Sequence, residues 1–499
     1  MAGLKSLLKD TAIYGLSSIL GRFINYLLVP LQTAKFLASG GEYGIVTNLM
    51  AYTALLLVIL TYGMETTFFR FANKPEEEAQ RVYSTTLMSV GITSLSFVAL
   101  VFLFLSPLST AMGYGEHQSY VAAMFTCVAI DAFKCIPMVY LRYQKRPIKF
   151  AAIQLLNIVL NIVLNVLYLV VFPLLRFDPC GLYDDHFTLD VGYVFYINLV
   201  CSLIVLLFFW KELTGFKYIL DKSLLWRMLR YTWPILFLGI AGILNLTADF
   251  ILFPHLYRGA DAYQQLGIYG AASKVAVIMA MITQAFRYAY EPFVFGKVQD
   301  KDSKETYAKV MKFFIIFTLL AFLGVIAYMD ILRYVVASDY WEGLRVTPIV
   351  MIGLILSGIY FNLSFWYKLT DRTIWGAWFS AVGSAVFIGV NVVAVPHYGY
   401  IACAWAGVAG YGTAMLLSYF VGQHYYKVDY PLRSIFAYVA ITVLLYVAMQ
   451  YVPATWATWQ KISMNTAILL LFVAHFLFYD VCDKHPRAFF QKYKNRLRR

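Results

Sequence analysis

The stretch of sequence that decides the fold is residues 231–254, which read YTWPILFLGIAGILNLTADFILFP. Asp249 is its one charged residue, and as an α-helix the stretch is long enough to cross the roughly 30 Å of hydrocarbon in a bilayer. Similar apolar stretches recur along the whole chain. They lie at residues 11–34, 43–64, 83–105, 118–141, 150–172, 191–210, 231–253, 266–295, 310–329, 346–367, 374–395, 400–422, 434–451 and 462–480.

This pattern predicts an all-α, polytopic membrane protein with about 14 transmembrane helices. Composition supports the prediction, because the 499 residues are 61% hydrophobic and only 13% charged, against roughly a quarter charged in soluble domains. The segments between the apolar stretches are short. None of them is long enough to form a soluble domain.

The positions of the cationic residues predict the orientation. Thirty of the 40 Lys and Arg lie in the two terminal segments and in alternate loops, if Lys312 at the edge of its apolar stretch is counted with the adjoining loop. Six lie in the loops between, and four lie inside the apolar stretches. Because cations collect on the cytoplasmic side of a membrane, this alternation predicts that both termini are cytoplasmic. The net charge of +13 then reflects topology and contact with anionic membrane lipids, and we expect no nucleic-acid partner.

Motifs of enzymes are missing from the sequence. The six cysteines are scattered and form no C-x-x-C pair, and the chain contains no H-E-x-x-H, no Walker loop and no G-x-S-x-G. These absences argue against a disulfide scaffold, a zinc site and the common nucleophilic and nucleotide sites. We therefore expect no enzymatic activity, no catalytic residues, no cofactor and no metal site.

A short repeat divides the chain into halves. Residues 25–30 read NYLLVP and residues 249–254 read DFILFP, and a similar distance after each proline the next apolar stretch begins, with YGI at residues 43–45 and GIYG at residues 267–270. Six helices separate the two copies. Because six is even, the copies have the same orientation, which is the symmetry of transporters with parallel repeats.

The repeat predicts two lobes of six helices and two further helices. We place the boundaries as follows: an N-terminal lobe at 1–210, a cytoplasmic amphipathic linker at 211–230, a C-terminal lobe at 231–422, two more transmembrane helices at 423–480, and a basic cytoplasmic tail at 481–499. The linker reads as an interfacial helix, because Leu224 and Met228 fall with Phe216, Ile219 and Leu220 on one side of it.

Charged residues inside the membrane are the first candidates for function, because each costs about 2.5–3.5 kcal/mol to insert. They are Arg22, Asp131, Lys134, Asp249, Lys274, Arg287 and Glu291. Two pairs have a local explanation. Asp131 with Lys134, and Arg287 with Glu291, are spaced to pair on one helix face, so a structural role is as well supported for them as a functional one.

Arg22 and Lys274 have no acidic residue three or four positions away. Arg22 lies about 16 Å into its helix, too deep to reach either membrane surface with ease. Each of the two therefore either lines a transport cavity or closes an ion pair, for which Asp249 is the obvious partner.

Amide side chains form a stripe on the fifth predicted helix. Asn157, Asn161 and Asn165 follow one another at four-residue spacing, which places them on one helix face. Such a ladder can hold helices together, or it can bind the hydroxyl groups of a sugar. Asn157 and Asn161, with Asn25 in the first helix, are our candidate amides for substrate binding.

Several segments resemble one known family. TAIYGL at residues 11–16, LVPL at 28–31, GIYGAASK at 267–274 and VPHYGYIACAW at 395–405 are similar to segments of the polysaccharide flippases in the multidrug, oligosaccharidyl-lipid and polysaccharide exporter superfamily. The resemblance covers the whole chain. It implies a V-shaped protein of two lobes that moves an isoprenoid (undecaprenyl) pyrophosphate-linked oligosaccharide to the outer leaflet by alternating access.

The same resemblance implies a location, partners and roles. The protein would lie in the cytoplasmic (inner) membrane of a bacterium and supply cell-surface polysaccharide such as lipopolysaccharide, with H⁺ or Na⁺ as coupling ions and with a polymerase and export proteins as partners. Its substrate would be a lipid-linked oligosaccharide. By this resemblance, the residues that would contact the anionic headgroup are Arg22, Lys274 and Arg287. The sites of charge balance or ion coupling would be Asp249, with Glu291 and Asp131.

Two other functions fit parts of the sequence. A cation-coupled multidrug exporter would have the same fold, but it should present acids to cationic drugs, whereas the membrane interior here carries four cations against three acids. A membrane-embedded glycan polymerase or ligase would need a large outward loop with catalytic groups. No loop of that size is present in the sequence.

Overall fold

The computed structural model describes residues 26, 28–178, 181, 183, 190–296, 303–370, 372–453 and 455–482. Every regular element in that part of the chain is helical, which confirms the all-α class. In the first half, the helices are α2 (Leu28–Lys35), η1 (Ala38–Gly40), α3 (Glu42–Thr61), α4 (Met64–Ala72), α5 (Ala79–Leu103), α6 (Leu105–Ala111), α7 (Gln118–Tyr143), α8 (Pro147–Val166), η2 (Leu167–Val171), α9 (Phe172–Leu175), α10 (Gly192–Leu207) and α11 (Trp210–Leu213).

The second half is helical in the same way. It contains α12 (Lys222–Leu256), α13 (Ala262–Gly296), α14 (Ser303–Ala327), α15 (Met329–Leu332), η3 (Arg333–Val335), η4 (Ser338–Val346), α16 (Thr347–Leu363), α17 (Phe365–Leu369), α18 (Ile374–Tyr398), α19 (Tyr400–Tyr425), α20 (Leu432–Gln450), α21 (Thr458–Phe476) and η5 (Leu477–Cys482).

Twelve helices of the described part are long and apolar enough to cross a membrane. Each matches one of the fourteen predicted spans. The span predicted at 191–210 corresponds to α10, a shorter apolar helix, and the span predicted at 11–34 lies mostly outside the described residues. A polytopic membrane fold is therefore confirmed, and the count of fourteen stays a prediction.

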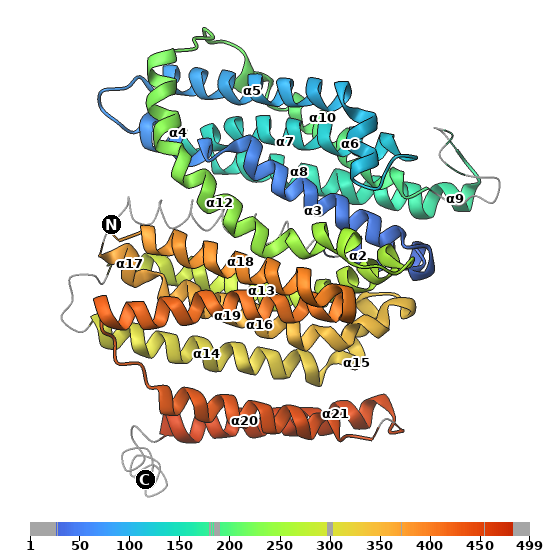
Figure 1. The fold of residues 1–499 in the computed structure, drawn as a ribbon, viewed down its shortest axis with the longest axis vertical. Helices are drawn as coiled ribbons and strands as arrows, with labels where there is room; N and C mark the ends of the chain where they lie inside the picture. The colour runs from blue at the N-terminus through green and yellow to red at the C-terminus, as the bar shows by residue number, and fades with distance from the viewer. Residues whose placement is uncertain are drawn as a thin grey trace, which may run out of the picture.

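The helices group into two bundles and a hairpin (Figure 1). The first bundle contains α3 to α10, the second contains α13 to α19, and the hairpin of α20 and α21 lies beside α14 of the second bundle. The long helix α12 starts among the helices of the first bundle and ends in the second. It is the one element that both bundles share in the described part of the chain.

The pattern of neighbouring helices repeats between the two bundles. In the first, α5 contacts α7, α7 contacts α10, α8 contacts α10 and α3 contacts α7. In the second, the helices six spans later make the same contacts: α14 with α16, α16 with α19, α18 with α19, and α13 with α16. The parallel repeat read from the sequence is thus a repeat of packing.

The loops that join the long helices lie on two opposite faces of the protein, which we call the basic face and the opposite face. The basic face holds the segments 73–78, 144–146, 214–221 and 426–431, and the opposite face holds 36–41, 112–117, 257–261 and Gly399. In Figure 1 the basic face is at the left and the opposite face at the right. The bundles converge toward the opposite face, where α2 and the start of α3 meet α13.

The predicted interfacial helix over residues 211–230 was wrong. Residues 214–221 contain no regular helix, and α12 begins at Lys222 and continues without interruption into the membrane. Leu224 and Met228 do not face lipid headgroups. They are fully buried against α4, α5 and α7 in an apolar cluster that includes Phe68 and Ile136. The amphipathic pattern was real, but its apolar side completes the core of the first bundle.

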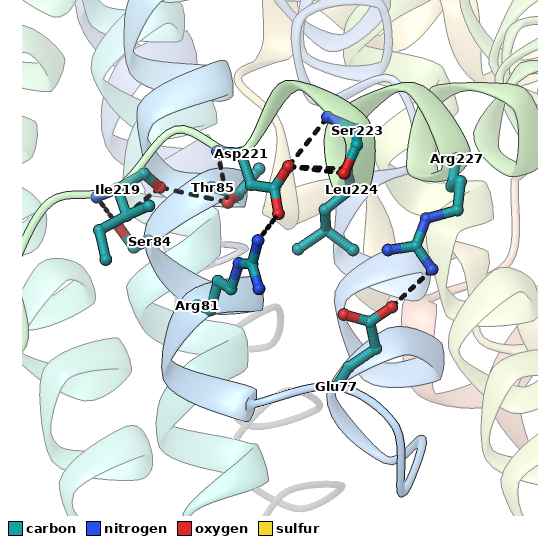
Figure 2. Close-up of polar contacts among 9 residues, drawn as sticks. All are labelled: Glu77, Arg81, Ser84, Thr85, Ile219, Asp221, Ser223, Leu224 and Arg227. Carbon is teal, nitrogen blue, oxygen red and sulfur yellow. Dashed lines mark hydrogen bonds and ion pairs between the residues drawn. The ribbon is translucent and has the colours of Figure 1, made fainter.

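Polar contacts fasten this connection to α5 (Figure 2). Ser84 accepts a hydrogen bond from the backbone N–H of Ile219 at 2.6 Å and donates one to the Ile219 carbonyl at 3.1 Å. Asp221 caps α12, because its Oδ1 accepts the backbone N–H groups of Ser223 at 2.9 Å and Leu224 at 3.1 Å. The first turns of α12 are therefore tied to the first bundle.

Two ion pairs strengthen the same attachment. Asp221 pairs with Arg81 of α5, and Arg227 pairs with Glu77 at 2.6 Å (Figure 2). The backbone N–H of Leu224, followed by the hydroxyl of Ser223, holds the pKa of Asp221 below its ordinary value. The carboxylate is thus charged at neutral pH and serves as helix cap and ion-pair partner together.

The C-terminal hairpin is held by a buried charge. Asp480 pairs with Lys312 of α14 and accepts a hydrogen bond at 2.5 Å from the Tyr438 hydroxyl of α20. Because all three groups come from different helices, this cluster fixes the hairpin against the second bundle at one position. The predicted tail at 481–499 lies almost wholly outside the described residues.

Removal of the cap should weaken the attachment of α12. We expect Asp221→Ala to lower the thermal unfolding temperature by a few degrees at pH 7, because the carboxylate accepts two backbone N–H groups and pairs with Arg81. Thermal unfolding of the purified protein measures this.

The control is Asp429→Ala, an exposed acid in another loop of the basic face. Since the folded-state pKa of Asp221 is depressed, its stabilisation is present in full above about pH 4 and is lost as the pH falls below that value. The difference between the wild type and Asp221→Ala should shrink on acidification. An unchanged unfolding temperature at pH 7 would contradict the role of Asp221.

Candidate functional site

A cavity of about 480 Å³ lies between the two bundles. Helices α2, α3, α8 and α10 line one side of it, and α12 and α13 line the other. Its polar lining is made of amides, hydroxyls and one cation. These residues are Gln32, Thr47, Asn157, Asn161, Asn198, Thr247, Ser273 and Lys274. No acid lines the cavity within the described part of the chain.

Lys274 is the cation of this cavity. It lies on α13, its side chain is exposed, and no described acid comes within ion-pair distance of it. The helix can approach α3 closely because Gly270, one turn earlier, leaves room for Thr47: a Cβ at Gly270 would lie 2.6 Å from the Thr47 hydroxyl. An unpaired ammonium inside a membrane protein needs water or an anion, so Lys274 is the residue of this lining that could hold an anion.

The asparagine stripe of α8 divides into two roles. Asn157 is exposed in the cavity and makes no hydrogen bond within the described part, whereas Asn165 is buried. Asn161 lies between these extremes: its Nδ2 donates to Asn198 of α10 at 3.1 Å, and its oxygens accept from Asn165. Asn165 thus holds helices together, while Asn157 and Asn161 face the cavity.

Asp249 lies behind the cavity wall, on α12. Its side chain is buried and accepts hydrogen bonds from the Tyr269 hydroxyl at 2.7 Å and from the backbone N–H of Phe250 at 2.9 Å. It forms no ion pair with any residue that the structure describes, so it does not neutralise Lys274. The two groups are an unpaired cation in the cavity and a buried carboxylate beside it.

The cavity is closed at the opposite face by close helix packing. The backbone of Gly44 on α3 contacts that of α13: a Cβ at Gly267 would lie 3.0 Å from the Gly44 nitrogen, and a Cβ at Gly44 would overlap the carbonyl oxygen of Tyr263. Near this contact, the Tyr340 hydroxyl of η4 donates to the Phe36 carbonyl, just after α2, at 2.6 Å. Small residues permit this approach.

Of the other predicted site residues, the two whose side chains the structure describes, Arg287 and Asp131, do not line this cavity. Arg287 is thirteen residues beyond Lys274 on α13, about 20 Å along the helix, and its guanidinium lies over the Phe361 ring at 4.1 Å. Glu291 is also in α13, but its side chain lies outside the described residues. Arg22 and Asn25 are outside them as well.

Asp131 makes its polar contacts within the first bundle. It pairs with Lys134 at 2.7 Å, as the spacing of the two residues on α7 indicates, and accepts a hydrogen bond at 2.6 Å from Ser202 of α10. Neither Asp131 nor Lys134 lines the cavity.

Sequence reasoning missed part of the lining. Asn198 was visible as an amide inside the predicted span 191–210, the same signal that identified Asn157. Thr47, Thr247 and Ser273 gave no signal, because Ser and Thr hydroxyls are common in membrane helices and usually bond to their own backbone.

Solved proteins of low sequence identity share this helical fold. The lipid II flippase MurJ, in an inward closed conformation, matches with a TM-score of 0.71 at 15% identity, over 94% of this chain and 99% of that chain. An inward-facing multidrug resistance MATE family transporter of the MOP superfamily matches with a TM-score of 0.61 at 14% identity, over 86% and 96%. The Vibrio cholerae MATE transporter VcmN matches with a TM-score of 0.54 at 14% identity, over 85% and 98%.

The fold is thus that of the superfamily of multidrug, oligosaccharidyl-lipid and polysaccharide exporters, a class of membrane flippases and transporters. Within it, residues 7–289 match the model of the polysaccharide biosynthesis proteins. The chain belongs to that family, in agreement with the resemblance found in the sequence. No curated protein matches the sequence significantly.

The seam at Gly44 should control access to the cavity. In a background without the six native cysteines, we expect Gly44→Ala to raise the labelling rate of a cysteine at position 157 several-fold from the opposite face, because the new methyl group must push α3 away from α13. Labelling with a membrane-impermeant maleimide from each side of the membrane measures the rate.

Gly40→Ala is the matched control, because its Cβ would meet only the flexible Glu42 side chain at 3.5 Å. Equal labelling rates in the two variants would show that the Gly44 contact does not close the cavity.

Proposed function

We propose that this protein moves an isoprenoid pyrophosphate-linked oligosaccharide from the cytoplasmic to the outer leaflet of a bacterial inner membrane, for the synthesis of cell-surface polysaccharide. One observation carries the proposal: the described lining of the central cavity holds a single cation, several amides and no acid. The family to which the chain belongs supports the same substrate class.

The chemistry of the cavity fits the two polar parts of such a substrate. A pyrophosphate is anionic, and in a low-dielectric site its hydrogen bonds to the Lys274 ammonium are far stronger than in water. Sugar hydroxyls both donate and accept hydrogen bonds, as the amides of Asn157 and Asn161 do. The lipid chain can stay in the bilayer while these groups cross.

A cationic drug would bind less favourably in this cavity. Its binding would place a positive charge beside Lys274 with no acid in the described lining to offset it. The cavity chemistry therefore favours a lipid-linked glycan over the substrates of a multidrug exporter.

The geometry suits alternating access. The seam between α3 and α13 closes the opposite face, which the distribution of cations predicts to be the outer side. Separation of the bundles at that seam would open the cavity to the outside. In this proposal both termini are cytoplasmic, residues 1–210 and 231–422 form the lobes that move, and the hairpin at 423–480 accompanies the second lobe.

Asp249 is the proposed site of energy coupling. A buried carboxylate without a cationic partner can take up and release a proton, or bind Na⁺, as its surroundings change. It lies on α12, which joins the two bundles. Arg22 and Arg287 are further proposed contacts of the headgroup, and Asp131 and Glu291 are alternative coupling sites. A polysaccharide polymerase and export proteins are proposed partners.

Deletion of the gene tests the function directly. We expect loss of surface polysaccharide, with a completed isoprenoid pyrophosphate-linked oligosaccharide accumulating on the cytoplasmic leaflet, as measured by lipid extraction. Normal surface glycan with new sensitivity to cationic dyes would instead indicate a multidrug exporter.

Complementation with variants tests the site. Lys274→Gln should lower export about tenfold or more, since a hydrogen bond to a charged group contributes roughly 1.5–3 kcal/mol, and Lys274→Arg should restore part of it. Lys461→Gln, which removes a cation from the first turn of α21 and outside the cavity lining, is the control. Full export by Lys274→Gln would remove Lys274 from the proposed site.

Coupling is tested with the purified protein in liposomes. Flipping of a lipid-linked oligosaccharide by the wild type should respond to an imposed H⁺ or Na⁺ gradient, and Asp249→Asn should abolish that response, because an amide cannot titrate. Asp131→Asn separates the two candidate carboxylates. A gradient response that survives Asp249→Asn and disappears in Asp131→Asn would transfer the role to Asp131.

A further inference from the structure

A second cavity, larger than the central one, opens between α5 and the start of α12. Its volume is about 910 Å³. The lining is mostly apolar, with a single charged group. It consists of Tyr62, Ser89, Ile92, Thr93, Leu220, Leu225, Trp226, Leu229, Arg230, Thr232, Trp233 and Leu236. We call this cavity the α5–α12 groove.

The floor of the groove is the short turn between helices α3 and α4. Helix α3 ends at Thr61, Tyr62 follows it with a φ of +33°, and α4 begins after Gly63, where φ is +73°. The polar groups at this turn are paired: the Tyr62 and Ser89 hydroxyls share a hydrogen bond of 2.7 Å, and the Thr232 hydroxyl donates to the Tyr62 carbonyl at 3.0 Å. Because these polar groups are already paired, the floor does not call for a polar ligand.

The walls of the groove expose apolar surface. Trp226 is 71% exposed, Trp233 is 61% exposed and Ile92 is 50% exposed. Tryptophan is enriched at the level of lipid headgroups, with its ring toward the acyl chains. The walls therefore suit a hydrocarbon chain that enters from the membrane.

Arg230 lies between the two tryptophans on α12, at the mouth of the groove. It is exposed and has no acidic partner among the residues that the structure describes. Its cationic neighbours differ: Arg227 pairs with Glu77, and Arg70 stacks over the Tyr231 ring at 4.0 Å. Of these three arginines, Arg230 alone lines the groove.

The groove is separate from the central cavity. Between them α12 packs on α3, where a Cβ at Gly239 would lie 3.0 Å from the Val58 side chain. A chain in the groove would therefore not continue into the site proposed for the pyrophosphate. This separation favours a resident membrane lipid over the chain of the transported substrate.

We propose that the α5–α12 groove binds an anionic diacyl phospholipid of the leaflet at the basic face, with its phosphate on Arg230 and an acyl chain between α5 and α12. Guanidinium and phosphate can form paired, charge-assisted hydrogen bonds. The cations of the basic face raise the local concentration of anionic lipids. The contacts between Asp221 and α5 hold the first turns of α12 in place. The lipid fills the space that remains between α5 and α12.

Lipid binding by the purified full-length protein tests the proposal without measuring transport. Native mass spectrometry or a bound-lipid assay in nanodiscs compares phosphatidylglycerol with phosphatidylcholine. We expect the wild type to retain phosphatidylglycerol preferentially and to unfold at a higher temperature in its presence. Arg230→Gln should reduce that preference about tenfold, and Lys222→Gln, an equal loss of charge on the same helix outside the groove, should leave it unchanged.

A second pair of variants tests the chain-binding part. Ile92→Trp should fill the groove and release the bound lipid, whereas Leu95→Trp, on an exposed position of α5 that does not line the groove, should not. Equal preference in the wild type and Arg230→Gln would overturn the phosphate contact. Displacement of phosphatidylglycerol by equimolar undecaprenyl phosphate would overturn the choice of a diacyl lipid and point to an isoprenoid chain.

Discussion

The close approach of α3 to α13 is the contact on which the rest of the structure depends. Gly44 and Gly267 bring two backbones together where any larger side chain would hold them apart. Because this seam lies at one face only, the space between the bundles narrows toward it and remains as a cavity farther along the same helices. The shape of the cavity and its closure at one end therefore have a single cause. Asn48 of α3 also donates a hydrogen bond at 2.6 Å to the Phe250 carbonyl of α12, beside this seam.

The distribution of charge within the membrane follows a simple rule. Most of the ionic groups that are present, such as Asp131 with Lys134 and Asp480 with Lys312, are paired between or within helices, since an isolated charge is costly there. Lys274 and Asp249 are exceptions, because neither is in an ion pair within the described part of the chain. Lys274 faces a cavity, and Asp249 accepts a hydrogen bond from a tyrosine hydroxyl. Both exceptions lie around the same space between the bundles, which is why the function is sought there.

Much of this arrangement could be predicted from the sequence. Twelve spans and the parallel repeat follow from apolar length and from a pattern of six residues, because the bilayer permits few alternatives to helices. Helical spacing predicts that Asn157 and Asn161 share a face with Asn165. It does not predict that the first two face the cavity while Asn165 is buried, because this depends on which neighbouring residue each amide meets. The prediction of an interfacial helix at 211–230 was wrong for a related reason. The apolar side of a helix has the same sequence pattern whether it meets lipid or, as for Leu224 and Met228, packs against a helix bundle. Pairing between helices, as in Lys312 with Asp480, leaves no local signal.

The first turns of α12 have a consequence for how the protein is made. Leu224 and Met228 are the last fully buried residues of the core around Phe68, so the first bundle is incomplete when only residues 1–210 have been synthesised. It closes once the chain has grown past Met228, by which time the helix that will lead into the second bundle has begun. A protein divided into two polypeptides would therefore be expected to reassemble better when cut at residues 257–261 than when cut within residues 211–230. Synthesis from the N-terminus lets each bundle form in turn, with α12 passed from one to the next.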